Sequence, residues 1–246
     1  MKLTFLGTNG WYDNAAGATI CAALETATEY IVLDAGFGIQ RLDSVIKTDK
    51  PIYIYLSHTH IDHVCGLHAL NKFAFAQGIK ICVSKPALAP MKKLVAPPYS
   101  VALDKLRMKV RFIKFSQLLR ELPHCSVAPL MHSVPCFGLR VQEKGKVFAY
   151  GPDTGLCPGL EKIAKDADLL ACECSYLPGE RNPGWPHMNP QDAATLAKRV
   201  GVKKLCLTHF EAKRYPDRSS RAQAQSAARK IFKNTFAVKD GMSFNI

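Results

Sequence analysis

The sequence has 246 residues, of which 48% are hydrophobic, and this predicts one globular domain over residues 1–246 with a sizeable core. It has 33 lysines and arginines against 20 aspartates and glutamates, a formal net charge of +13 that favours anionic partners. No apolar run approaches membrane-spanning length, and we find no low-complexity tract or internal repeat, which excludes a membrane-spanning protein and a repeat protein.

The first elements predicted are three strands, over residues 2–6, 19–24 and 29–34. The N-terminal apolar stretch is too short for a signal peptide, so we expect a cytoplasmic protein. The loop Gly7–Gly10 between the first two strands has glycines that let the backbone approach another group closely. Asp34 ends the third strand, either as an ordinary strand-end cap or as a group that orients a metal ligand.

A cluster of three histidines and one aspartate follows the next predicted strand, residues 52–56: His58, His60, Asp62 and His63. Imidazole and carboxylate together suit Zn²⁺ or another first-row metal. The first two histidines can point the same way from an extended segment, while the aspartate and the third histidine face a neighbouring position. The four side chains can form one closed site, and a two-metal site needs further ligands. The alternative is a polar loop that is rich in histidine.

A helix is predicted next, over residues 66–77, then strands over 79–84 and 107–115, separated by a proline-rich loop. Residues 80–121, here called the basic segment, contain ten lysines and arginines and two acidic residues, a local net charge of +8. Such a surface attracts phosphates, although a generally basic surface without function is the alternative.

The second half repeats one arrangement, in which a predicted strand ends at a polar residue. The predicted strands are residues 127–131, 137–141, 146–150, 169–175, 203–208 and 236–238. His132, Asp153 and His209 follow three of them, so we expect these side chains and the histidine cluster to meet in one crevice. Helices are predicted over residues 190–200, with Asn189 as N-cap, and over 219–232. The nine cysteines, an odd number in apolar surroundings, predict reduced and buried thiols.

The complete pattern, His-x-His-x-Asp-His followed by a distant His, a distant Asp and a final His, resembles the metallo-β-lactamase fold superfamily. The resemblance covers the whole chain and implies an α/β fold, a four-layer αββα sandwich. It implies two divalent metal ions, Zn²⁺ or else Mn²⁺ or Fe²⁺, with a hydroxide between them as the nucleophile. The implied first-metal ligands are His58, His60 and His132, the second-metal ligands are Asp62, His63 and His209, and the bridging carboxylate is Asp153.

Within this superfamily, the segments 151–155 and 207–210 look most like those of ribonuclease Z and its phosphodiesterase relatives. There a Glu and a later His support the scissile phosphate, which implies this role for Glu173 and His187. The family's Glu-Ala-Thr and His-Ser-Thr appear here as Glu-Cys-Ser and His-Met-Asn. Ribonuclease Z also has a tRNA-gripping arm between the third-His and bridging-Asp motifs, where this chain has only twenty residues. Its absence favours a smaller or unstructured substrate.

The resemblance therefore implies a dinuclear phosphodiesterase or nuclease that acts on an anionic phosphodiester, a nucleic acid or a nucleotide. Asp62 doubles as ligand and proton acceptor, and His187, held by Glu173, stabilises the phosphate or protonates the leaving oxygen. One alternative is a lactone, thioester or other carboxylic ester hydrolase on the same metal site. A second is a non-catalytic metal-binding protein. The oligomeric state stays open, a homodimer included.

Overall fold

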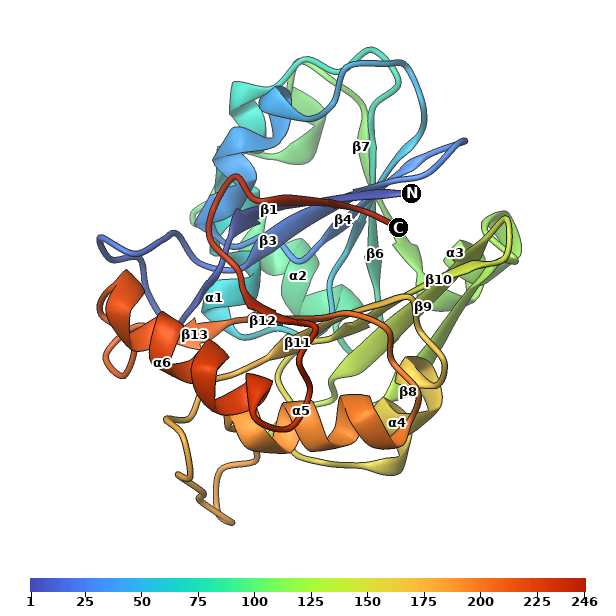
Figure 1. The fold of residues 1–246 in the computed structure, drawn as a ribbon. Helices are drawn as coiled ribbons and strands as arrows, with labels where there is room; N and C mark the ends of the chain where they lie inside the picture. Colours follow the sequence, from blue (N-terminus) through green and yellow to red (C-terminus); the bar gives the residue numbers. More distant parts are fainter.

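The computed structural model describes residues 1–246 and contains two large β-sheets flanked by helices (Figure 1). The first sheet has the order β15-β1-β3-β4-β5-β6-β7, with β1 Lys2–Gly7, β3 Cys21–Glu25, β4 Tyr30–Leu33, β5 Ile52–Tyr55, β6 Ile79–Val83, β7 Val110–Lys114 and β15 Ser243–Asn245. The second has the order β14-β12-β11-β10-β9-β8, with β8 Cys125–Pro129, β9 Phe137–Glu143, β10 Lys146–Gly151, β11 Leu169–Glu173, β12 Leu205–Thr208 and β14 Thr235–Ala237.

Nine helical segments connect these strands. The α-helices are α1 Ile61–Val64, α2 Leu88–Leu94, α3 Phe115–Glu121, α4 Pro158–Ala164, α5 Pro190–Arg199 and α6 Arg218–Arg229. The 3-10 helices are η1 Phe37–Ser44, η2 Cys65–Lys72 and η3 Leu103–Lys105. None of the helices is both long enough and apolar enough to cross a bilayer.

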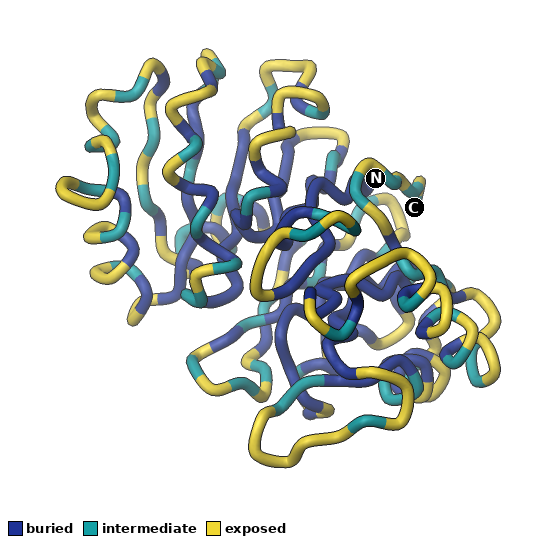
Figure 2. Tube along the Cα trace, turned by 90° about the vertical axis from the view of Figure 1, so that its left-hand side faces the viewer, coloured by how far each residue is buried: buried dark blue, intermediate teal, exposed yellow.

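Three hydrophobic clusters separate four layers. The first lies between the first sheet and η1, η2 and α2, the second between the two sheets, and the third between the second sheet and α4, α5 and α6. Strand β5 follows the two-residue period, because Ile52 and Ile54 join the first cluster whereas Tyr53 and Tyr55 join the second. Figure 2 shows the buried strands inside and exposed loops around them. The predicted αββα sandwich is confirmed.

The parallel part of each sheet determines where the strands deliver their polar ends. Strands β4, β5, β6 and β7 are parallel in the first sheet, and β10, β11, β12 and β14 in the second. A short parallel pair joins the two halves near these ends, β2 Asn9–Gly10 with β13 Phe210–Glu211. The carboxyl ends of parallel strands meet at one edge of a sheet, as the sequence analysis expected.

The predicted helix over residues 66–77 is wrong in length and type. The chain forms the 3-10 helix η2, and Phe73 is already extended. The apolar residues Leu67, Leu70 and Phe73 are spaced by three, which suits a three-residue turn as well as the start of an α-helix. The strand predicted over residues 107–115 is shorter in the structure, where β7 covers only Val110–Lys114. All nine cysteines are free and eight are buried.

Candidate metal centre

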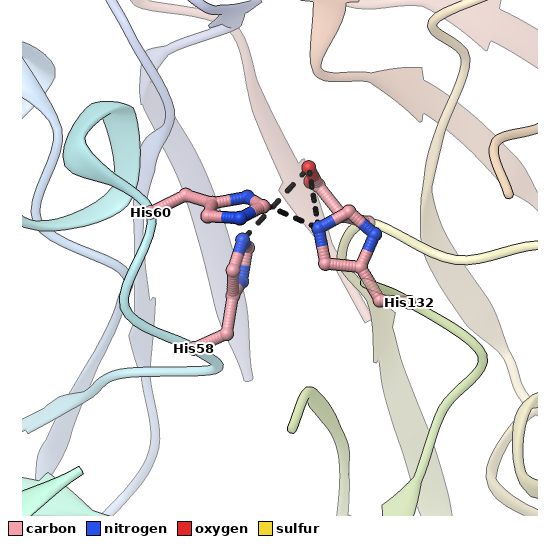
Figure 3. Close-up of side chains that lie close together, drawn as sticks. His58, His60 and His132 are labelled. Atoms are coloured by element: carbon pink, nitrogen blue, oxygen red, sulfur yellow. Dashed lines mark hydrogen bonds and ion pairs between the residues drawn. The ribbon is translucent and has the colours of Figure 1, made fainter. Parts of the chain in front are cut away.

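The seven predicted metal ligands meet at the shared edge of the two sheets. They form two groups, one of His58, His60, His132 and Asp153 and one of Asp62, His63 and His209. Within each group the possible ligand atoms all lie within 4.8 Å of one another. Figure 3 shows the three histidines of the first group converging from two separate stretches of the chain.

Asp153 lies between the two groups and presents one carboxylate oxygen to each. Its Oδ1 is 3.1 Å from Nε2 of both His63 and His209, which are themselves 3.0 Å apart at Nε2. Its Oδ2 is 3.9 Å from Nε2 of His58 and 3.8 Å from Nε2 of His132. A carboxylate in this position can contact two neighbouring cations at once.

The donor atoms fit divalent cations. Nε2 of His58 and Oδ1 of Asp153 are buried without a hydrogen-bond partner, although Oδ1 is within ion-pair distance of His63 and His209. An unsatisfied buried polar atom costs about 1–3 kcal/mol, so two on neighbouring side chains need a compensating interaction. Five imidazoles and two carboxylates form a donor set that Zn²⁺ prefers and that other first-row metals accept.

Asp34 lies behind the metal ligands and is fully buried. Its Oδ2 accepts hydrogen bonds from His63 Nδ1 at 2.8 Å, Ser57 Oγ at 2.8 Å and the Tyr150 hydroxyl at 2.6 Å. Since Nδ1 of His63 donates to this carboxylate, its Nε2 is left to face the metal position. Of the two roles predicted for Asp34, these contacts match a group that orients a metal ligand rather than a simple strand-end cap.

The charges of the first group favour metal-binding forms of its side chains. Burial lowers the pKa of His58 and lowers that of His132 to about 4, so both imidazoles are neutral and offer an electron pair. Burial raises the pKa of Asp153, but His209 and His63 outweigh it and hold that pKa well below its usual value. The carboxylate is therefore ionised.

The glycine loop approaches the second group of ligands, as its sequence predicted. A Cβ on Gly10 would lie 2.4 Å from Cε1 of His209, so only glycine lets this backbone pack against the imidazole. The next residue, Trp11, donates its backbone N–H to Oδ2 of Asp62 at 2.8 Å. The loop thus fixes two of the three ligands in this group.

We expect Gly10→Ala to weaken metal binding at this second position, because the added methyl group displaces the His209 ring. Metal analysis of the purified variant should give less than the wild-type content, and metal should raise its thermal midpoint less. Gly145→Ala is the matched control, since a Cβ there has no atom within 4 Å and tests only the positive φ of a hairpin turn. Unchanged metal content in Gly10→Ala would contradict the packing role.

His187 and Glu173 form a pair beside the metal ligands. Nδ1 of His187 lies 2.6 Å from Oε1 of Glu173, which also accepts the Thr154 N–H at 2.9 Å. Glu173 is fully buried, while Cys172 and Cys174 on either side of it join the outer hydrophobic cluster, as the strand period predicts. Burial lowers the pKa of His187, but Glu173 outweighs this effect and raises it to about 9.

His187 faces a cavity of about 250 Å³, and Glu173 does not line it. The lining residues are Trp11, His60, Ile61, Asp62, Asp153, Trp185, His187 and His209. Neither tryptophan was predicted from the sequence to belong to the site. The available signal was that each stands beside a glycine, as Gly10-Trp11 and Gly184-Trp185, in a loop next to predicted site residues.

The basic segment lies outside this cavity. Lys80 is already paired, with its Nζ 2.7 Å from Oε2 of Glu121. Lys92, Lys114 and Arg120 line a separate groove, and none of the ten basic residues lines the metal cavity. Any effect of this segment on substrate therefore acts at a distance from the reacting bond.

Relatives of this chain are found along its full length. It is 28% identical to ribonuclease Z from Ligilactobacillus salivarius, over all of this chain and 97% of that protein. That alignment spans 311 positions against 246 residues here, so the relative has at least 65 positions that this chain lacks.

Two solved structures share the fold. The metallo-beta-lactamase fold protein YhfI from Bacillus subtilis has a TM-score of 0.80 at 20% identity, covering 99% of this chain and 98% of that one. The short form of human tRNase Z has a TM-score of 0.74 at 23% identity, covering 100% and 99%. The family model described as the beta-lactamase superfamily domain matches residues 29–210. The chain therefore belongs to the metallo-β-lactamase superfamily, in which it is similar to ribonuclease Z.

Proposed function

We propose that this protein is a dinuclear metal-dependent phosphodiesterase. The observation that carries the proposal is the position of Asp153, with one oxygen toward each of two ligand groups, beside a histidine held by a buried glutamate. Hydrolysis by a metal enzyme is supported by relatives named ribonuclease Z that cover the whole chain.

His58, His60 and His132 would hold one cation, Asp62, His63 and His209 the other, and Asp153 both. Two divalent cations held there would lower the pKa of a water and stabilise the charge that develops in an in-line displacement. Zn²⁺ is the cation this donor set suits best, with Mn²⁺ or Fe²⁺ as alternatives.

The chain's own residues handle the protons. Asp62 lines the cavity, and its Oδ2 forms hydrogen bonds with the Trp11 N–H at 2.8 Å and with His209 Nε2 at 3.3 Å. Asp62 can therefore serve as ligand and proton acceptor. His187 has Nδ1 engaged by Glu173, which leaves Nε2 to donate a hydrogen bond to a phosphate oxygen or a proton to the leaving oxygen. Glu173 acts through His187 and is a positioning residue.

The shorter chain favours a small or unstructured substrate over folded tRNA. Ribonuclease Z from Ligilactobacillus salivarius has at least 65 alignment positions without a counterpart here. Only twenty residues separate His132 from Asp153, and the β9–β10 hairpin uses most of them. We therefore propose nucleotides and single-stranded nucleic acid as substrates.

The test combines metal analysis with a substrate panel. Purified protein should contain two first-row metal ions per chain and hydrolyse bis(p-nitrophenyl) phosphate or a cyclic nucleotide faster than a lactone or a thioester. Asp153→Asn, prepared in parallel, controls for contaminating hydrolases. Preference for the lactone or thioester would replace the phosphodiesterase by a carboxylic ester hydrolase, and two bound metals without any hydrolysis would favour a binding protein.

We also expect the basic segment to attract polyanionic substrates. Replacing Lys92, Lys93 and Arg107, all exposed, by alanine should raise KM for a single-stranded oligonucleotide. It should also reduce the steepness of the slope of log(kcat/KM) against log[salt] by up to about two, because fewer counterions are released. Lys162, Lys230 and Lys233, exposed in the other half, give a control triple variant with the same charge change. Equal slopes in both variants would assign the basic segment to ordinary surface.

A further inference from the structure

The two tryptophans of this chain both line the metal cavity. They come from different halves of the fold, Trp11 directly after β2 and Trp185 from the loop that precedes α5. Both remain accessible, with exposed fractions of 60% for Trp11 and 37% for Trp185. An indole left in contact with water beside a reaction site is available to bind a ligand.

The backbone of each tryptophan is fixed. Trp11 has a φ of 70°, in the left-handed region that few large residues adopt, and its N–H binds Asp62. The carbonyl of Trp185 accepts the Tyr176 hydroxyl at 2.6 Å, and its N–H donates to the Asn182 carbonyl at 3.1 Å. These contacts fix the backbone of both tryptophans next to the groups that would act on the substrate.

The Trp185 ring also lies close to the predicted catalytic His187 and to His132, a predicted metal ligand. The Trp185 ring centroid is 6.1 Å from that of His187 and 6.3 Å from that of His132. Ile61, which is 66% exposed, adds a third apolar side chain to the cavity lining. None of the eight lining residues is a lysine or an arginine. Away from the predicted metal ligands and His187, the group next to the scissile bond therefore meets aromatic and apolar side chains rather than lysine or arginine.

We propose that Trp11 and Trp185 bind a nucleobase that adjoins the scissile phosphate, so that the preferred substrates are nucleotide phosphodiesters rather than simple alkyl ones. This inference rests on the proposed phosphodiesterase function. Stacking uses the π-face that every base has, so it selects an aromatic ring without selecting its sequence. The cavity's modest volume, about 250 Å³, suits one small unit of substrate rather than a folded macromolecule.

The first test measures binding without turnover. The ligands are AMP and ribose 5-phosphate, which differ only in the base. Metal-loaded protein is titrated with AMP while tryptophan fluorescence is followed. The affinity for ribose 5-phosphate, which has no base, is measured by its competition with AMP. Wild-type protein should bind AMP roughly tenfold or more tightly than ribose 5-phosphate. Trp11→Ala and Trp185→Ala should each reduce that ratio several-fold, and Trp→Phe at the same positions should restore part of it.

The controls separate stacking from folding. Trp11→Ala keeps the backbone N–H that binds Asp62, so its metal content should equal that of wild type. Tyr12→Ala removes a neighbouring aromatic side chain that is 51% exposed but does not line the cavity, and it should leave the AMP preference unchanged. If Trp→Phe variants that retain fold and metal lost all the AMP preference, an indole-specific contact would replace simple stacking and overturn the proposal as stated.

The second test measures turnover with one leaving group. The p-nitrophenyl ester of thymidine 5′-phosphate and methyl p-nitrophenyl phosphate both release p-nitrophenolate, and only the first carries a base. Wild type should favour the thymidine ester in kcat/KM by roughly tenfold or more, and the alanine variants should lose most of that preference. Hydrolysis of both esters at equal efficiency would overturn the nucleobase inference and leave the phosphodiesterase intact. Selective binding of AMP without hydrolysis of either ester would overturn the phosphodiesterase and leave the nucleobase inference intact.

Discussion

Asp153→Ala should remove metal from both positions and abolish most of the hydrolytic activity. Its two oxygens face different ligand groups, at 3.1 Å from His63 and His209 and at 3.8–3.9 Å from His132 and His58. Loss of an outer partner of a metal ligand already costs about 10–100-fold in metal affinity, and the loss of a shared ligand should exceed that. Metal content by mass spectrometry and kcat/KM on bis(p-nitrophenyl) phosphate measure the two effects.

His132→Ala provides the comparison, because it belongs to one group alone. We expect this variant to lose the first metal and retain the second, which gives a content near one metal ion per chain. Asp34→Asn should weaken the second position by about 10–100-fold, because Asp34 orients His63. A fully active wild-type protein with a single metal ion, or an Asp153→Ala variant that still holds two, would contradict the dinuclear assignment.

His187→Ala should lower kcat by about 10²–10⁴ on a substrate whose leaving group is an alkoxide. Such a group must be protonated as it leaves, and His187 faces the cavity with Nε2 free while Glu173 holds its Nδ1. On a p-nitrophenyl ester, whose leaving group departs unprotonated, the loss should be much smaller. The measurement is kcat for the variant and wild type on a dinucleotide and on bis(p-nitrophenyl) phosphate.

Glu173→Gln should act in the same direction with a smaller loss. The amide can still accept from the Thr154 N–H, so the loop beside Asp153 keeps its position, but it no longer carries the charge that His187 faces. Metal content should be unchanged in both variants. Equal losses on the two leaving groups, or loss of metal in His187→Ala, would give this histidine a structural role instead.

The convergence of the predicted metal ligands was largely predictable from sequence because parallel strands present their ends at one edge. His58, Asp153 and His209 each follow a strand in the sequence, and the sheet order then determines that they meet. The glycine of the loop before Trp11 was predicted to allow a close approach, and it packs on the His209 ring. These signals depend only on local pattern and on strand direction.

The parts that failed depend on packing between distant segments. The 3-10 helix η2 has the apolar spacing that also begins an α-helix. It packs closely against the start of η1, because a Cβ added at Gly66 would lie only 2.3 Å from the Gly36 carbonyl oxygen. The short helices α2, α3 and α4 have seven residues each, too few for a clear period. The pairing of Lys80 on β6 with Glu121 on α3 was also not predicted, although both charges were included in the net charge of the basic segment.

Because each predicted ligand group is assembled from both halves of the chain, a cation bound there would cross-link the two halves. His58 and His60 come from the first half and His132 from the second, while Asp62 and His63 meet His209 in the same way. A cation that binds only when the two halves are docked stabilises the docked state by mass action. At a free concentration a thousand times its dissociation constant, one such cation adds about 4 kcal/mol to the free energy of unfolding. We therefore expect the protein's thermal stability to depend on the metal supply of its surroundings.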